Sequence, residues 1–233
     1  MQVIARIRND FPTKFGLPRQ SGLVPELVSR IVFEPEYRVP EALRGIESYS
    51  HLWLIWGFHQ AVRGSAGKDD EASWRPTVRP PRLGGNTRMG VFATRSPFRP
   101  NPLGLTVVKL LGVEDTPDGQ VLVVAGADMM DGTPVYDVKP YLPYVDSVPG
   151  ATGGFTEETS GYALQVEIPE ALLARIPQSM RDTLAGVLAQ DPRPAYQHDE
   201  SRVYGLPIGG LDVKFVVRGD TLTVTDVIRS DGK

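Results

Sequence analysis

Two arginines and an asparagine stand on a proline-stiffened stretch near the middle of the chain, Arg95–Gly104 (RSPFRPNPLG). Three prolines within eight residues restrict the backbone, so Arg95, Arg99 and Asn101 are presented without a helix or a strand ladder. The packing of a core does not require this composition, whereas a preorganised site for an anion and an amide-binding group does. The stretch therefore predicts a binding or catalytic site.

Two further polar clusters precede this stretch. In Pro18-Arg19-Gln20, a fixed backbone places an arginine fork beside an amide, a pair that suits a carboxylate and a hydrogen-bonding edge. An ordinary loop with an exposed arginine is the simpler interpretation of these residues. His59 and Gln60 stand where an apolar strand that starts at His51 runs out, and on a regular strand His51 and His59 would share one face. We interpret His51 as structural and His59 as functional.

Acid–base groups follow the segment Asp131-Gly132-Thr133-Pro134, which by itself is typical of a turn before a strand. Asp137 and Lys139 lie two residues apart, on one face of the expected strand, so a charged pair between them is predicted. With Tyr141, they supply an acid, a cation and a hydroxyl.

A last motif, Asp191–Tyr196 (DPRPAY), displays Arg193 beside an aromatic residue on a stiff turn. Such a pair suits RNA phosphate and base stacking. A turn that ends a helix explains it equally well.

Short apolar runs between Pro- and Gly-rich turns must position these residues. Their length and their content of Val, Ile, Leu and aromatic residues predict strands. The absence of strand–helix alternation, and of a G-x-G-x-x-G fingerprint, argues against a doubly wound Rossmann domain. The pattern favours a mainly β sandwich or closed barrel. The expected strands are Gln2–Ile7, Val28–Phe33, His51–Phe58, Gly90–Thr94, Leu103–Leu111, Val121–Ala127 and Pro134–Val138.

The pattern changes after Pro149, and we predict two domains, residues 1–149 and 150–233. The second is expected to be a small α+β unit, with helices at Pro169–Ile176 and Gln178–Leu188 and a strand at Tyr162–Ile168. Near its end, apolar and polar residues alternate in Asp212–Val217 and Thr221–Ile228, which predicts a β-hairpin with its turn at Gly219-Asp220.

Composition excludes several kinds of chemistry. The 233 residues contain no cysteine, which removes disulfides, thiolate zinc sites and Cys-ligated iron–sulfur clusters. Only three histidines are present, so no resident metal is expected. No apolar run is long enough to span a membrane, and the N-terminus lacks a signal-peptide pattern, so we expect a soluble cytoplasmic protein.

Charge is unevenly distributed along the chain. Ala72–Val113 contains seven basic residues and no Asp or Glu, and the rest of the chain contains 18 basic against 28 acidic residues. A locally basic segment in an acidic protein predicts a focused anion site. Pairing of these arginines with acids elsewhere in the fold accounts for the pattern equally well.

Taken together, these motifs resemble the TrmO-like (TsaA) tRNA methyltransferase family. The order of the matching stretches and the length of the central one make the joint resemblance specific, whereas Val62–Ser73 and the chain beyond His198 vary. The matching stretches are Pro18–Gln20, Leu43–Glu47, Ser50–Trp53, Phe58–Gln60, Trp74–Gly85, Arg88–Gly104, Asp131–Asp146 and Val187–Tyr196.

The resemblance implies a non-Rossmann β-barrel that binds S-adenosylmethionine (SAM), works as a homodimer and methylates N6 of threonylcarbamoyladenosine at position 37 of threonine tRNA. It implies contact with the anticodon loop, where the basic segment would meet phosphates. The cofactor residues it implies are Pro18, Arg19, Gln20, His59, Gln60, Arg95, Asp131, Gly132, Thr133 and Pro134.

Methyl transfer from a sulfonium is an in-line displacement, so an enzyme mainly positions the nucleophile and excludes water. We hypothesise a general base, Asp137 or His59, for the N6 proton. Arg99 or Lys139 is expected to hold the threonyl carboxylate. Asn101 and Tyr141 complete the predicted catalytic set.

Two alternatives remain open from the sequence. The barrel could bind RNA or a nucleotide without catalysis, or it could methylate another substrate with SAM. The sequence does not identify the base, the preferred tRNA or the dimer interface.

Overall fold

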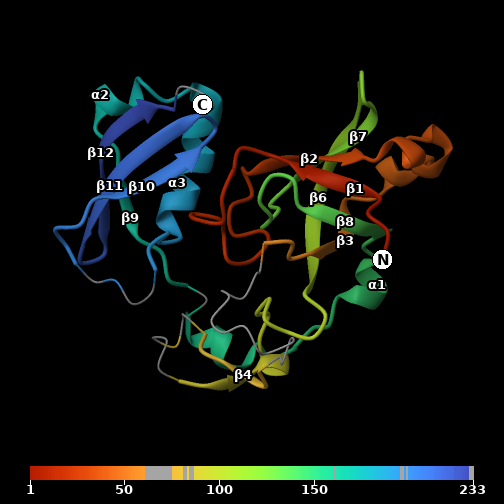
Figure 1. Ribbon diagram of the computed structural model, residues 1–233, viewed down its shortest axis with the longest axis horizontal. Coiled ribbons are helices and arrows are strands. Elements are labelled where there is room, and N and C mark those ends of the chain that lie inside the picture. Colours follow the sequence, from red (N-terminus) through yellow and green to blue (C-terminus); the bar gives the residue numbers. More distant parts are fainter. Residues whose placement is uncertain are drawn as a thin grey trace, which may run out of the picture.

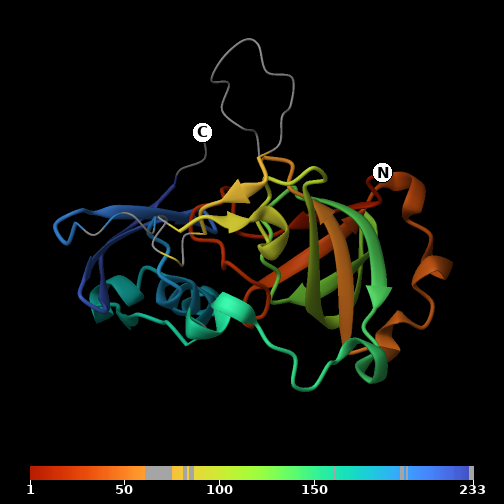
Figure 2. The same ribbon diagram turned by 90° about the horizontal axis from the view of Figure 1, so that it is seen from below.

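The computed structural model describes residues 1–60, 75–80, 83, 87–159, 161–194, 197 and 199–230, with only the backbone of 158 and 159. Six strands pair in the order β1-β2-β7-β6-β3-β8, and β8 pairs back onto β1, so the sheet is a closed barrel (Figures 1 and 2). The expectation of a mainly β chain is confirmed. The six strands are β1 Ala5–Arg8, β2 Val28–Phe33, β3 His51–Gly57, β6 Leu103–Thr116, β7 Gly119–Ala125 and β8 Pro134–Pro140.

Alternation of side chains explains the barrel interior. Along β3, Leu52, Leu54 and Trp56 are buried while the residues between them are partly exposed, as a period of two requires. Leu54 and Trp56 join Ile7 and Ile31 from β1 and β2 in the barrel core. The polar groups of the site are therefore attached to a rigid apolar scaffold.

The C-terminal half contains a four-stranded sheet in the order β10-β11-β12-β9, with helices against it (Figure 1). The predicted hairpin is confirmed, because β11 and β12 pair antiparallel around Gly219-Asp220. This half has its own core, to which Leu184 of α3 and Phe215 of β11 contribute. The elements are β9 Gln165–Glu167, α2 Glu170–Leu173, α3 Arg181–Ala189, β10 Tyr204–Ile208, β11 Leu211–Arg218 and β12 Thr221–Arg229.

The connection between β1 and β2 belongs to both halves. Phe11, Val24 and Leu27 are buried in the C-terminal core, although the strands on either side of them are in the barrel. In Figure 1 this segment runs between the two halves. The connection is fastened there by hydrogen bonds from the Gly209 amide to the Asp10 carbonyl, 2.9 Å, and from the Thr183 hydroxyl to the Glu26 carbonyl, 2.9 Å.

Several predicted boundaries are wrong. The strand expected at Gly90–Thr94 is instead the end of β5 (Met89–Gly90) followed by the 3-10 turn η5 (Val91–Ala93). The amide and the hydroxyl of Thr94 both donate to the Val91 carbonyl, which closes a turn rather than a ladder. Among the described residues β5 pairs with β4 (Thr77–Val78) alone, and this pair forms an arm that projects below the barrel in Figure 1.

The predicted helices and one predicted strand are shorter than expected. The first expected helix is reduced to α2, and the second begins as the 3-10 turn η7 (Gln178–Met180) before α3. The strand expected at Tyr162–Ile168 is reduced to β9. Among the helices that the structure describes, none has the length and apolarity that a membrane span requires.

Candidate functional site

The structure brings together two predicted motifs that lie 75 residues apart. Nη1 of Arg95 donates a hydrogen bond to Oε1 of Gln20 over 2.6 Å. Within the Pro18–Gln20 loop, Pro18 is buried, Arg19 is exposed and Gln20 is half-buried. An arginine and an amide from separate loops therefore form one polar group at the surface.

The loop that carries Arg95 is held by its own polar atoms. The Ser96 amide donates to Oγ1 of Thr94 over 3.2 Å, and Nη1 of Arg99 donates to the Thr94 carbonyl over 3.3 Å. Arg99 is thus half-buried against its own loop, whereas Asn101 is exposed. The predicted stiffness of this stretch has a physical basis in these bonds as well as in its prolines.

The His59-Gln60 turn lies next to the same loop. The Phe58 amide donates to the Pro102 carbonyl over 2.9 Å, directly after Asn101. Both His59 and Gln60 are exposed. Because β3 ends at Gly57, His59 lies beyond the strand, and the expectation that it shares a strand face with His51 is wrong.

Asp128 is a polar residue of this region to which the sequence prediction assigns no role. Oγ1 of Thr106 donates to its Oδ1 over 2.9 Å, and Nε1 of Trp56 donates to the Thr106 hydroxyl over 2.9 Å. Burial raises the pKa of the Asp128 carboxyl above its usual range, against the opposing effects of Thr106, its own backbone amide, the Arg95 charge and the Ser21 amide. An acid directly after an apolar strand is the signal that could have indicated it.

The Pro18–Gly22 loop is seated on the chain just before Asp128. The Gly22 amide donates to the Gly126 carbonyl over 2.9 Å. Gly126 has φ 77°, and a Cβ there would meet the Gly22 backbone at 3.2 Å, so only glycine fits without strain. The two loops and the end of β7 thus form one contiguous region.

The polar groups of the Asp131–Pro134 turn form hydrogen bonds with the N-terminal strand and the residue that follows it. Oδ1 of Asp131 accepts the Asn9 amide over 3.2 Å, and the Gly132 amide donates to the Ile7 carbonyl over 2.8 Å. The hydroxyl of Thr133 donates to the Met130 carbonyl over 2.8 Å, and both Thr133 and Pro134 are buried. This predicted cofactor turn is near Asp128 in the chain, but these groups already have partners within the protein.

Three predicted catalytic residues lie on the outer face of β8 and beyond it. Asp137 and Lys139 form the predicted ion pair, 2.9 Å between Oδ2 and Nζ. They stand opposite Ile55 and Trp53, whose side chains alternate with the buried ones of β3. Tyr141 packs against the rings of His51 and Trp53, with centroids 6.2 and 5.9 Å apart.

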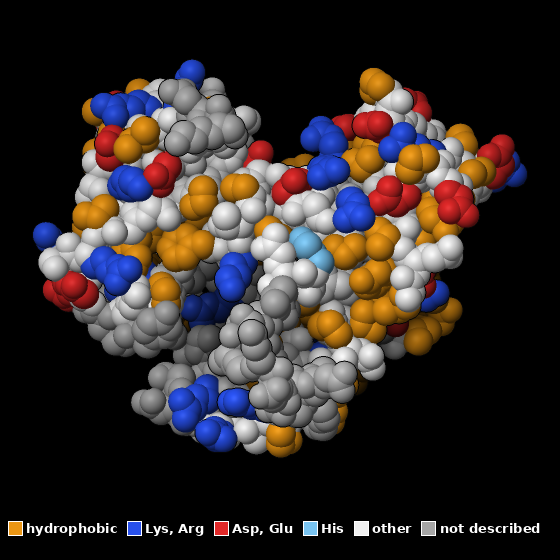
Figure 3. All heavy atoms as spheres, in the orientation of Figure 1, with side chains coloured by type: hydrophobic (Ala, Val, Ile, Leu, Met, Phe, Trp, Pro, Cys, Tyr) orange, Lys and Arg blue, Asp and Glu red, His pale blue; other side chains and the backbone are white. Residues whose placement is uncertain are grey.

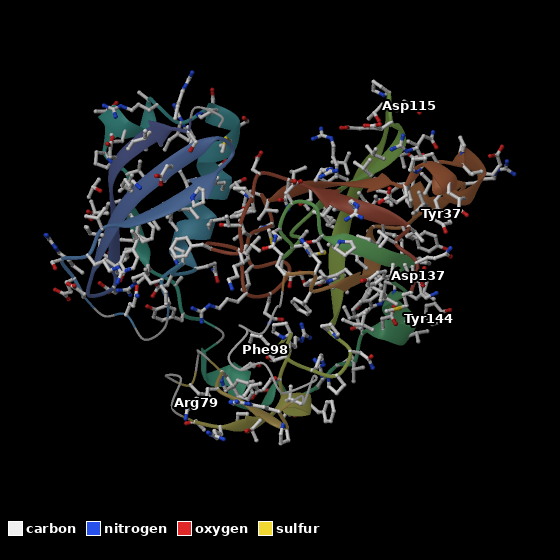
Figure 4. All side chains as sticks on the ribbon, viewed as in Figure 1. Tyr37, Arg79, Phe98, Asp115, Asp137 and Tyr144 are labelled. Atoms are coloured by element: carbon white, nitrogen blue, oxygen red, sulfur yellow. The ribbon has the colours of Figure 1, made fainter. Side chains whose placement is uncertain are left out.

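The outer face of β8 is separate from the Gln20–Arg95 pair. In Figure 4, Asp137 and Tyr144 lie on the barrel side away from Phe98, which belongs to the Arg95 loop. Among the described residues, no hydrogen bond or ion pair joins Asp137 or Lys139 to that loop. Asp146 is a structural acid: the Leu142 amide and then Nε1 of Trp53 hold the pKa of its carboxyl below the usual range.

The basic segment is displayed on the β4–β5 arm. Arg75, Arg79 and Arg88 are exposed there, and Figure 4 marks Arg79 on the arm. Figure 3 shows Lys and Arg side chains gathered on this arm, and others in the hollow between the two halves of the molecule. Arg82 and the Val62–Ser73 stretch lie outside the described residues.

Arg193 is held within the C-terminal half. Its Nε and Nη2 donate to the two carboxylate oxygens of Asp191 over 2.8 and 2.9 Å, and Tyr162 donates to the same carboxylate over 3.0 Å. Burial raises the pKa of Asp191, but the bonds and charge of Arg193 and the bond from Tyr162 outweigh it, so the net shift is downward. This arrangement favours the structural interpretation of the motif. Tyr196 lies outside the described residues.

Comparison with known proteins agrees with this arrangement of barrel and C-terminal sheet. Residues 6–147 match the family model of the tRNA-methyltransferase O N-terminal domain, and residues 162–230 match that of the TrmO C-terminal domain. A tRNA (adenine(37)-N6)-methyltransferase from Escherichia coli (strain K12) is 42% identical over 223 residues, 92% of this chain and 91% of that protein.

Two further matches extend over nearly the whole chain. A putative S-adenosylmethionine-dependent methyltransferase RcsF from Pseudomonas aeruginosa is 41% identical over 98% of this chain and 97% of its own length. A crystal structure of TrmO superposes with a TM-score of 0.76 at 35% identity, covering 98% of this chain and 99% of that one. The chain belongs to the TrmO family.

Proposed function

We propose that this protein is a SAM-dependent tRNA methyltransferase that methylates N6 of threonylcarbamoyladenosine at position 37 of threonine tRNA. The family and the printed activity of its 42%-identical relative support this reaction. The observation that supports it within the fold is the hydrogen bond that joins Gln20 to Arg95, near the half-buried carboxylate of Asp128. We also propose that it acts in the cytoplasm.

The chemistry of these groups fits SAM. When bound, SAM supplies an activated methyl group on a sulfonium. An arginine such as Arg95 suits its carboxylate, and an amide such as Gln20 suits its hydrogen-bonding edges. We propose that the barrel end formed by Pro18–Gln20, His59-Gln60 and Arg95 holds the cofactor, with no Rossmann fingerprint needed.

The remaining cofactor candidates have a supporting place in this proposal. The Asp131–Pro134 turn is fastened to β1 and fixes the start of β8, so it shapes the cofactor end of the barrel through its backbone. Arg99 and Asn101 share a loop with Arg95, and we propose that they orient the substrate next to it. His59 is exposed beside that loop, which suits a base for the N6 proton.

The outer face of β8 can take part in the reaction only if another molecule contacts it, and this face carries Asp137 and Lys139, with Tyr141 just beyond. We propose that a second copy of the chain makes this contact. Leu105 is 57% exposed opposite Ile55 on this face, and Tyr144 and Val145 of α1 (Pro143–Asp146) are 85% and 59% exposed nearby. Exposed apolar side chains of this kind are typical of an interface between subunits.

We propose that tRNA contacts the β4–β5 arm. Its exposed arginines belong to the window Ala72–Val113, which contains no acidic residue, so they offer charge to phosphates of the anticodon loop. The predicted C-terminal domain is proposed to support that contact from the other side of the hollow (Figure 3).

The decisive experiment supplies methyl-labelled SAM with tRNA that carries or lacks the threonylcarbamoyl group, followed by digestion and nucleoside analysis. We expect labelled N6-methylated nucleoside only from the modified tRNA. Arg95→Ala should lose SAM affinity, while Arg44→Ala, an exposed arginine at a distant turn of the barrel, should behave as wild type. Label on neither RNA with intact SAM binding would refute the substrate assignment and favour a binding module, and label on the unmodified tRNA would favour another methylation substrate.

A further inference from the structure

Asp128 is oriented from inside the barrel by two donors in series. Trp56 of β3 donates to the hydroxyl of Thr106 on β6, which is 3% exposed. Because a hydroxyl has a single proton, and Thr106 gives it to Oδ1 of Asp128, the relay points in one direction, toward the carboxylate. The side chain of Asp128 is thus fixed by atoms that belong to the barrel core.

On its other side, Asp128 faces both cofactor loops. The backbone amide of Ser21 and the positive charge of Arg95 both act to lower the pKa of its carboxyl, so both favour its charged form. Arg95 in turn holds Gln20 over 2.6 Å. The Pro18–Gly22 loop is therefore held by hydrogen bonds from the Gly22 amide to the Gly126 carbonyl and from Arg95 to Gln20, and the charged carboxylate of Asp128 favours the positions of the Ser21 amide and of Arg95.

The position of Asp128 does not favour stability. Burial penalises its charged form, so a neutral side chain of the same shape would be tolerated at least as well by the fold. A half-buried charge that weakens stability and faces two loops of a site is typical of residues retained for function. Removing the charge is therefore expected to leave the stability of the fold unchanged or higher, and to weaken ligand binding.

We propose that Asp128 is a positioning residue, which locks the Pro18–Gly22 loop and Arg95 to the barrel so that Gln20 and Arg95 meet the cofactor in one arrangement. The proposal builds on the proposed function in taking SAM as the ligand. It predicts that Asp128 acts on cofactor affinity and not on the methyl-transfer step itself.

Asp128→Asn is the test, because the amide keeps the shape and an oxygen acceptor for Thr106 but loses the charge. SAM affinity is measured by calorimetry, turnover at saturating SAM by label transfer, and stability by thermal unfolding. We expect an unchanged or higher Tm, a Kd for SAM raised about tenfold or more, and kcat within about twofold of wild type. Asp115→Asn, an exposed acid at the far end of β6 (Figure 4), is the matched control and should change none of these.

Thr106 provides a second variant that does not touch the carboxylate. Thr106→Ser keeps the relay and should bind SAM as wild type, whereas Thr106→Val removes the hydroxyl and should weaken SAM binding in the same direction as Asp128→Asn. Wild-type SAM affinity in both Asp128→Asn and Thr106→Val would overturn the proposal. A collapse of kcat with normal SAM affinity would also overturn it, since Asp128 would then act on the reacting atoms.

A readout without ligand separates this proposal from the proposed function. Amide hydrogen exchange of the free protein should show faster exchange at Ser21 and Gly22 in Asp128→Asn, with the barrel strands unchanged. If wild type fails to bind SAM but this acceleration is seen, the loop lock stands and the cofactor assignment fails. Unchanged exchange at both amides would refute the lock whatever the ligand.

Discussion

Gly104 lies directly opposite Trp56 in the pairing of β6 with β3, and the indole occupies the space where a side chain would be. A Cβ at Gly104 would lie less than 3.0 Å from three atoms of the Trp56 ring, a separation that real Cβ atoms essentially never show. Trp56 is 6% exposed and packs on Phe58 with ring centroids 4.3 Å apart. Gly104→Ala must therefore displace a buried tryptophan.

The expected loss follows from two contributions. Overpacking a core typically costs about 1–3 kcal/mol. Displacing the indole also breaks its buried hydrogen bond to Thr106, worth about 1 kcal/mol. The free energy of unfolding should therefore fall by about 2–4 kcal/mol. With a urea m-value of about 2 kcal/mol/M, the midpoint should fall by roughly 1–2 M.

Tryptophan fluorescence in urea is the suitable assay, because Trp53 and Trp56 both lie on β3 and report on the barrel. Gly90→Ala is the matched control, since no atom lies within 4 Å of a Cβ there. The control also carries the same reduction in unfolded-chain freedom, which is worth about 0.4–1 kcal/mol in the opposite direction. If Gly104→Ala unfolds at the same urea concentration as Gly90→Ala, the indole is not seated as described and the reasoning fails.

Three further outcomes are expected. Asp191→Asn should lower the free energy of unfolding by about 3 kcal/mol at pH 7, because it leaves the Arg193 fork without its carboxylate, and circular dichroism in urea would measure this. Since the folded pKa of Asp191 is lowered, the stabilisation by its charged form is present above the ordinary pKa of 3.8 and is lost as pH falls through the folded pKa. The difference in free energy of unfolding between Asp191→Asn and wild type should therefore shrink in acid, and a difference that stays constant would contradict the assignment. Phe215→Ala should remove about 3–5 kcal/mol from the C-terminal core, seen by the same method, and a loss below 1 kcal/mol would be inconsistent with its complete burial. Arg79→Ala should reduce the slope of log K against log salt for tRNA binding by about 1 relative to Arg44→Ala, and an identical slope would exclude a phosphate contact.

Local patterns in the sequence predicted the strands and the local pairs well. The alternation from His51 onward located β3, and the spacing of Asp137 and Lys139 predicted an ion pair that the structure contains. Both depend on the period of two along a strand, which a short stretch of sequence determines. Gly90–Thr94 failed for a complementary reason: its apolar residues suit a strand, but a threonine that bonds back to the Val91 carbonyl closes a turn.

The site was only partly predictable, since its parts meet through tertiary contacts. The sequence indicated that Gln20 and Arg95 were functional, but not that one would hold the other across 75 residues. Asp128 was not recognised because its environment depends on a hydroxyl from β6 and an indole from β3. Arg193 was considered for RNA contact because the sequence does not show that Asp191 already occupies its guanidinium.

The connection between β1 and β2 couples ligand binding to the union of the two halves. Its ends are in the barrel, three of its side chains are buried in the C-terminal core, and its middle carries Gln20. Any ligand that restrains Gln20 also restrains a segment whose release would separate the cores, so part of the binding energy resists their separation. By reciprocity, a substitution deep in the C-terminal core, far from Arg95, alters the ligand affinity of the barrel. Removing the C-terminal half would also remove the contacts that hold the loop on which ligand binding depends.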